Sequence, residues 1–304
     1  MNKFDEYQFA KYDRENLVTL QDVVLLCHPK PNSPERAELY KKILNKELAV
    51  PDTWEVELSR GADKGETFTR LLKEEKLGYL ALLRNLRLMT NNGVDQDLIK
   101  EAILSRKGGK YTYPFRFLAA FRAAPQFGQE LNSALLASLN DLYVMEGKTA
   151  VLVDVSSSMD ARLSQKSDLS RVDAAATLGA VFPGQENRVF SFSNSLVEIQ
   201  GAKGVEGVEA IKRSQYHGGT ALIQAVDTVL RHDKFDRIVV VTDEQANNDY
   251  RRIENLGEGL QRYIINVGMD QNGIAYGSWT HIHGFSENVF RFMEEFERGF
   301  KTKE

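Results

Sequence analysis

Asp154, Ser156 and Ser158 are the residues whose types and spacing best fit a chemical task. They alternate along the chain, and alternate residues of an extended segment point to the same side. One carboxylate and two hydroxyls are hard oxygen ligands, which suit Mg²⁺ and Mn²⁺ better than zinc or copper. Asp243 offers a second carboxylate and Thr220 a third hydroxyl. This set predicts a divalent-cation site, with Mg²⁺ as the expected ion and Mn²⁺ or Ca²⁺ as alternatives.

Short apolar runs lead into both of these carboxylates. Residues 149–154 read Thr-Ala-Val-Leu-Val-Asp, and a later run reads Val-Val-Val-Thr before Asp243. Continuous apolar runs are typical of buried parallel strands, and open α/β sheets hold ligands at the carboxyl ends of their strands. A simpler interpretation is that the serines after the first run cap the next helix. The paired glycines before Thr220 and the position of Asp243 at a strand end favour the cation site.

The rest of residues 148–304 alternates between strand and helix patterns. Such alternation, with apolar strands, predicts a doubly wound, mostly parallel α/β sheet of the Rossmann-like kind, covered by helices on both faces. The expected further strands are 188–192, 196–199, 237–242 and 262–267, and the expected helices are 172–182, 205–212, 221–230, 252–260 and 287–296.

Residues 1–147 predict helices throughout. Ser33-Pro34-Glu35 is typical of a helix start, because serine caps free amides and proline suits the first turn. Residues 78–89 predict a helix that ends at Asn-Asn-Gly, with one apolar face formed by Leu80, Leu83, Leu86 and Met89. Antiparallel helix pairs with short connections are expected here, and we place the domain boundary between residues 147 and 148.

Composition excludes several protein classes. The chain has 304 residues, a formal net charge of −4 and a single cysteine, Cys27, so neither an intramolecular disulfide framework nor a cysteine-based zinc cluster is expected. It shows neither a membrane-spanning apolar stretch nor the apolar core of a signal peptide near Met1. We therefore expect a soluble, cytoplasmic protein with no membrane partner.

One stretch of the first half, residues 102–129, contains basic side chains and no acidic ones. It would bind phosphate if folding gathered these side chains on one face. An ordinary solvated helix face, with acids supplied from elsewhere, explains it equally well. The basic residues are Arg106, Lys107, Lys110, Arg116 and Arg122.

Enzyme motifs are missing from the sequence. It has neither a phosphate loop nor a nucleophile elbow, and Ser156 stands where a phosphatase of the two-aspartate kind needs an acid. His281 and His283 could share one face of a strand, but without a third ligand we interpret them as ordinary strand residues. We expect a protein that is not an enzyme.

The predicted cation site resembles the metal-ion-dependent adhesion site of von Willebrand factor A domains, over about residues 148–300. Segments of the first half resemble the TROVE module of the Ro autoantigen family, so that the resemblance covers nearly the whole chain. In that family a long stretch of helical repeats precedes the segment that begins at Lys11, and we expect that N-terminal part of the ring to be absent here. The segments are Lys11-Tyr12-Asp13-Arg14, Leu20-Gln21-Asp22-Val23, His28-Pro29-Lys30-Pro31, Leu82-Leu83-Arg84-Asn85-Leu86 and Tyr113-Pro114-Phe115-Arg116.

The resemblance implies HEAT-like helical repeats joined to a von Willebrand A domain. Ro-like proteins form ribonucleoproteins with small noncoding Y RNAs and hold misfolded RNAs in quality control, and bacterial relatives work with an exonuclease. It implies RNA contacts at Lys11, Arg14, His28 and Lys30, while Arg84, Arg87 and Arg116 are further candidates. His28 alone also fits a histidine that bonds the last carbonyls of a helix. The competing hypothesis is a metal-dependent interaction module that captures an acidic group of a partner protein.

Overall fold

A computed structural model gives the structure of the chain. It describes residues 3–12, 17–49, 52–109, 112, 114–139, 143–165, 169–245, 253, 255–268, 278–286 and 288–301. The chain divides into two compact units, which are described separately: residues 1–77 with 88–98, and residues 78–87 with 99–304. The division falls within two helices, α6 (Tyr79–Asn91) and α7 (Gln96–Ser105).

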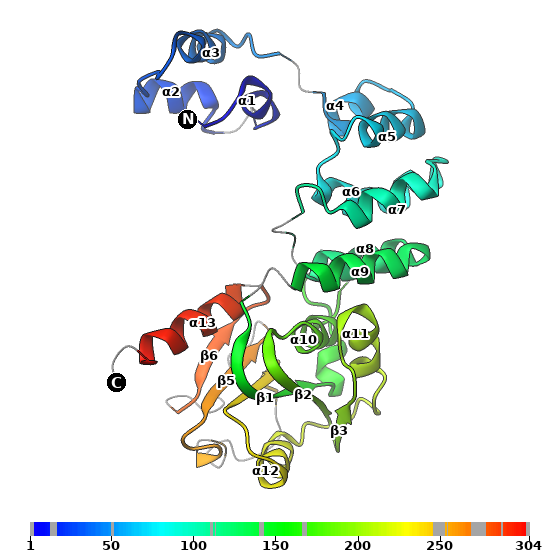
Figure 1. Ribbon diagram of the computed structural model, residues 1–304, viewed down its shortest axis with the longest axis vertical. Coiled ribbons are helices and arrows are strands. Elements are labelled where there is room, and N and C mark those ends of the chain that lie inside the picture. The colour runs from blue at the N-terminus through cyan, green and yellow to red at the C-terminus, as the bar shows by residue number, and fades with distance from the viewer. Residues whose placement is uncertain are drawn as a thin grey trace. The chain divides into compact units, whose positions relative to one another are not determined.

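The first unit is built from short helices (Figure 1). Helices α1 (Glu6–Tyr12), α2 (Leu20–Cys27) and α3 (Pro34–Asn45) enclose a small core. Helix α3 begins where predicted, and the Ser33 side chain accepts the Arg36 N–H. In α4 (Trp54–Ser59) and α5 (Lys64–Lys73), the rings of Trp54 and Phe68 stack 6.0 Å apart. The core residues of the first three helices are Phe9, Val24, Leu39, Tyr40 and Ile43.

Helix α6 confirms the helix predicted for residues 78–89, and three of the four residues predicted on its apolar face are buried. Leu83, Leu86 and Met89 are buried, whereas Leu80 is 40% exposed because Tyr79 and Leu82 occupy the buried side instead. The Tyr79 hydroxyl donates to the Ile103 carbonyl over 2.8 Å. The remaining helices before the sheet are α7 (Gln96–Ser105), α8 (Pro114–Ala123) and α9 (Gly128–Leu139), with a short 3₁₀ turn, η1 (Pro125–Phe127).

The second unit contains a six-stranded sheet in the order β3-β2-β1-β4-β5-β6. Every neighbouring pair is parallel except β2 and β3, which are antiparallel. The mostly parallel α/β sheet is therefore confirmed, and strands begin within a few residues of the predicted positions. The strands are β1 (Met145–Asp154), β2 (Gly184–Phe192), β3 (Leu196–Ile199), β4 (Arg237–Thr242), β5 (Gln261–Asn266) and β6 (Thr280–His283).

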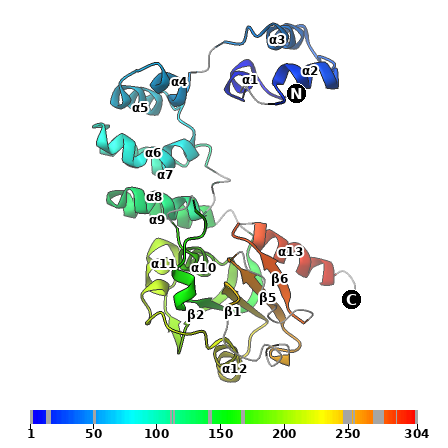
Figure 2. The same ribbon diagram turned by 180° about the vertical axis from the view of Figure 1, so that it is seen from behind.

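Helices cover both faces of this sheet (Figure 2). On one face, α12 (Leu222–His232) packs against alternate strand residues such as Leu152, Val240 and Ile264. The other face carries α10 (Arg171–Ala180), α11 (Gly204–Lys212) and α13 (Asn288–Lys301). Gly179 of α10 lies so close to this face that a Cβ would stand 2.6 Å from a methyl group of Val153. Alternation along each strand thus divides the buried side chains between two helical layers.

Helices α8 and α9 pack on α10 and α11 within this unit. Arg122 of α8 pairs with Asp173, a buried residue of α10 that also pairs with Lys212. The side chain of Asn132 in α9 accepts the Val205 N–H over 2.9 Å, near the start of α11. Helix α11 has no capping hydrogen bond from its own N-cap residue, Lys203, so α9 supplies one instead.

Two sequence-based expectations differ from the structure. The helix expected at 252–260 is not an α-helix in the described residues: Ile253 and Asn255 are 3₁₀, residues 256–259 form turns, and Gly257 and Gly259 take positive φ values of 69° and 88°. Two glycines in that conformation end a helix instead of continuing it. The segment after Asp154 is extended only to Ser156, because η2 (Ser157–Asp160) begins there. Among the described residues, none of the helices is both long and apolar enough to cross a membrane.

Candidate functional site

The predicted cation ligands meet at the carboxyl ends of β1 and β4, which are neighbours in the sheet. Asp154 is the last residue of β1, and Asp243 directly follows β4. The hydroxyls of Ser156 and Ser158 lie 3.2 Å apart, and Ser158 donates to an Asp243 carboxylate oxygen over 3.2 Å. Neighbouring parallel strands therefore bring four of the five predicted ligands into one hydrogen-bonded group.

Asp154 is fully buried, and among the described residues its carboxylate accepts hydrogen bonds only from neutral donors. One oxygen accepts the Ser156 N–H over 2.8 Å, and the other accepts the Thr242 hydroxyl over 2.6 Å. Burial raises the pKa of Asp154 to about 6, although these hydrogen bonds oppose it, and the nearby charge of Asp243 adds to the rise. A divalent ion would supply the positive charge that this carboxylate needs in order to stay ionised at neutral pH.

Asp243 differs from Asp154, because a cationic side chain reaches it. Arg171, at the start of α10, donates through Nη1 to Asp243 Oδ2 over 2.7 Å, and only 17% of the Arg171 side chain is exposed. Gly268 packs against the other side, where a Cβ would stand 3.0 Å from the Asp243 Cβ. Arg171 was not predicted as a neighbour of this site, because it lies 72 residues from Asp243 along the chain. A bound ion and this guanidinium would share one carboxylate.

Thr220 lies in a loop that is tied to the same sheet edge. The Ser157 N–H donates to the Gly218 carbonyl over 3.0 Å, and the Ser193 hydroxyl accepts the Gly218 N–H over 2.8 Å. Gly218 also lies where a Cβ would meet the Asn194 amide at 2.2 Å, so a larger residue would displace the Asn194 side chain. Thr220 itself is buried, and within the described part of the chain it is the one predicted ligand outside the hydrogen-bonded group formed by the other four.

The predicted RNA-contacting residues of the first unit are partly described. His28 ends α2 with a positive φ of 41°, and its N–H donates to the Val24 carbonyl while its side chain is exposed. Lys30 is exposed two residues later. Lys11 falls in α1, but its side chain and the whole of Arg14 lie outside the described residues.

The candidates of the second unit lie on α6 and α8. Arg84 and Arg87 are both exposed, and Arg87 donates through Nε to the Ala123 carbonyl over 3.2 Å. Arg116 is half-buried, with its guanidinium 4.8 Å from the centre of the Phe115 ring. Arg122, from the acid-free stretch, is committed to Asp173 and so serves the fold.

Comparisons with known proteins show a family match over part of the chain. Residues 45–174 match the family model of the TROVE domain. This segment belongs to the TROVE domain family. The TROVE resemblance predicted from the sequence is thereby confirmed, and the matched segment contains Arg84, Arg87 and Arg116 together with the first three predicted metal ligands, Asp154, Ser156 and Ser158.

Two relatives extend the comparison. The chain is 31% identical over 91 residues to mouse (Mus musculus) "Telomerase protein component 1", a match that covers 28% of this chain and 4% of that protein. The chain thus spans only a small part of the length of that relative. It also resembles the crystal structure of the Deinococcus radiodurans RO (RSR) protein with a TM-score of 0.65 and 17% identity, over 98% of this chain and 75% of the other. At that identity the likeness shows the fold, in which TROVE helices precede the α/β sheet.

Proposed function

We propose that the chain is a Ro-type RNA-binding protein that binds small noncoding, Y-like or misfolded RNA in RNA quality control. The observation that carries the proposal is the TROVE match over residues 45–174. The likeness to a Ro protein structure over 98% of the chain supports it, because the same order of helices and sheet domain recurs. This function requires binding, and no chemical step by the protein.

The exposed arginines of α6 are the RNA contacts best supported within the TROVE segment. Arg84 and Arg87 are three residues apart, which places them on one side of the helix. Guanidinium groups suit RNA because they bind phosphate with two parallel hydrogen bonds and stack on bases. The hydrogen bond from Arg87 Nε to the Ala123 carbonyl holds the side chain in place and leaves its two terminal nitrogens beyond this bond.

Salt dependence of RNA binding tests this assignment. Each phosphate neutralised adds about 0.7–0.9 to the slope of log affinity against log salt, so the double variant Arg84→Ala/Arg87→Ala should lower the slope by roughly 1.4–1.8. Filter binding with a structured RNA and with a single-stranded RNA measures it. The matched control is Arg213→Ala/Arg231→Ala, which removes two exposed arginines paired with acids on α11 and α12. Equal slopes for the two double variants would refute the assignment to α6.

The same protein would hold a divalent metal ion, Mg²⁺ above all, through Asp154, Ser156, Ser158, Thr220 and Asp243. Support comes from the hard oxygen donors and from the raised pKa of Asp154, a buried carboxylate with neutral donors. When bound, the ion would offer a Lewis-acidic position to an acidic group. The chain's own residues would hold the ion and balance its charge.

Capture of a partner protein, such as an exonuclease, through this metal is the second candidate function. The observation that favours it is the exposure gradient of the site, in which Ser158 is only half-buried while Asp154 and Ser156 are buried. Pull-down from RNase-treated lysate, with and without a chelator, tests it. Partner retention that needs both metal and Asp154 supports this candidate, and retention that disappears with RNase supports RNA binding instead.

A further inference from the structure

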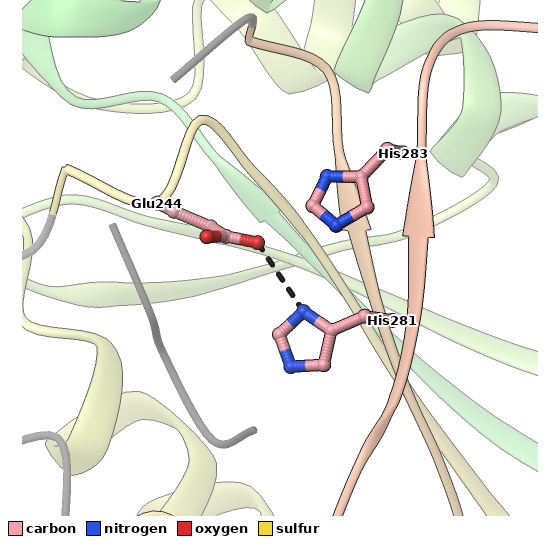
Figure 3. Close-up of side chains that lie close together, drawn as sticks. All are labelled: Glu244, His281 and His283. Carbon is pink, nitrogen blue, oxygen red and sulfur yellow. Dashed lines mark ion pairs between the residues drawn. The ribbon is translucent and has the colours of Figure 1, made fainter. Parts of the chain in front are cut away.

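We propose that Glu244, His281 and His283 form a second metal site, which takes a first-row transition metal ion such as Zn²⁺. The ligand atoms of these three residues all lie within 4.8 Å of one another. Figure 3 shows the Glu244 carboxylate directed toward the two imidazole rings. The two histidines alone did not predict a site. The fold adds the third ligand from a segment 37 residues before His281 in the sequence.

The sheet brings the three residues together. His281 and His283 are alternate residues of β6, so they lie on the same face of that strand, with their rings 6.1 Å apart. Glu244 follows β4, which is separated from β6 by β5 alone. Its carboxylate crosses the end of β5 to reach His281. Strand β6 and the segment that follows β4 therefore place the three side chains together.

The backbone at Glu244 supports a specific role for its side chain. Its φ is 59°, in the left-handed region that costs a non-glycine residue about 1 kcal/mol or more. Such conformations persist where the surrounding structure enforces them, and they gather at functional sites. The Glu244 N–H donates to the Thr242 hydroxyl over 3.1 Å, which holds this turn. The turn aims the side chain toward β6 instead of continuing the direction of β4.

The separation between the Glu244 and His281 ligand atoms fits coordination to one ion. Glu244 Oε1 and His281 Nδ1 are 3.3 Å apart. Two ligands about 2.0–2.1 Å from a tetrahedral zinc ion stand about 3.4 Å from each other, whereas a typical N–H···O hydrogen bond measures about 2.9–3.0 Å. Glu244 is completely buried, and buried carboxylates are paired or coordinate metals. His283 is exposed, so the ion would have a route to solvent.

The ligand types select the metal class. Two imidazoles and one carboxylate suit zinc and its first-row neighbours, whereas Mg²⁺ prefers oxygen ligands and belongs at the Asp154–Asp243 site. Three protein ligands leave a fourth tetrahedral position for water or another group, as in open zinc sites. The chain would then carry two cation sites of different chemistry on consecutive residues, because Asp243 serves one and Glu244 the other.

Zinc affinity in excess Mg²⁺ tests the proposal, with protein free of any polyhistidine tag. A chromophoric chelator competing for Zn²⁺ should report one tightly held ion per chain. His283→Ala removes an exposed ligand without disturbing the core and should weaken Zn²⁺ binding at least tenfold, on the order of what lost zinc-site contacts cost. The matched control is His232→Ala, because this histidine donates to the Thr228 carbonyl and belongs to no such cluster among the described residues.

Two further variants keep the result interpretable. Glu244→Gln keeps the size of a buried side chain and should also weaken Zn²⁺ binding, with loss of the visible spectrum of Co²⁺ bound in its place. Asp154→Asn should leave Zn²⁺ affinity unchanged. The proposal is overturned if the wild-type chain retains no Zn²⁺, if His283→Ala binds as the wild type does, or if Asp154→Asn alone abolishes binding. None of these outcomes depends on RNA binding.

Discussion

Asp154→Asn should stabilise the metal-free protein at neutral pH. Burial raises the pKa of Asp154 from 3.8 to about 6, so at pH 7 the folded state must hold an ionised carboxylate that its surroundings disfavour. That difference in pKa corresponds to about 3 kcal/mol of unfolding free energy. Asparagine keeps the shape, and its amide can donate to the Thr242 hydroxyl while its oxygen accepts the Ser156 N–H.

The pH dependence follows from the direction of the shift. Because the folded-state pKa lies above the unfolded one, ionisation of Asp154 costs the folded wild type nothing below about pH 4 and its full amount above about pH 6. The stability gap between Asp154→Asn and the wild type should therefore open between these values and then level off. Urea unfolding in EDTA at a series of pH values measures the gap.

Mg²⁺ should reverse the order of stability, so that the wild type becomes more stable than Asp154→Asn. At a thousand times its dissociation constant, a ligand that binds only the folded state stabilises it by about 4.1 kcal/mol, which exceeds the gap of about 3 kcal/mol, and only the wild type has both carboxylates. Asp227→Asn is the control, since that residue forms an exposed ion pair with Arg231 that is worth under about 1 kcal/mol. A metal-free Asp154→Asn protein that is less stable than the wild type at pH 7 would refute the reasoning.

Two further variants probe the packing of the second unit. Asp173→Asn should cost about 2–4 kcal/mol at pH 7 in urea unfolding, because it breaks a buried charge pair with Lys212. Although burial works to raise it, the pKa of Asp173 is lowered, above all by the Lys212 hydrogen bond, so this loss should shrink as the pH falls below about 4. Gly207→Ala should lower the thermal midpoint, at about 1–3 kcal/mol, because its Cβ would stand 2.6 Å from the Ala202 backbone. Gly299→Ala, with open space around the new methyl group, should instead leave the midpoint unchanged or raise it.

The sequence predicted the sheet well because its strands are continuous apolar runs, and β4 begins and ends where the pattern placed it. Helices were located by their apolar period, but their exact buried face was less certain. Leu80 was assigned to the buried face of α6, and Tyr79 took that side instead. With 3.6 residues per turn, a strict spacing of three drifts by about 60° at each step, so Leu80 lies about half a turn away from Met89 and leaves the buried face.

The position of the two carboxylates of the proposed cation site was predictable because Asp154 ends one apolar run and Asp243 follows another, and strand ends meet at a known edge. The side chains that contact these carboxylates were not predictable. Arg171 reaches Asp243 from the start of another helix, and nothing in its local sequence marks that contact. The contact of Glu244 with β6 was not predictable either, because His281 lies far along the chain and the left-handed backbone at Glu244 does not show in the sequence.

The Asn132 bond to the Val205 amide has a practical consequence for anyone shortening this protein. A version starting at residue 148 would remove that amide's acceptor and strip Arg122 from the buried Asp173 carboxylate. Such a fragment would expose to solvent the surfaces of α10 and α11 that α8 and α9 cover in the longer chain. Expression of the sheet region should accordingly retain α8 and α9, even where domain borders drawn on strand and helix content suggest a later start.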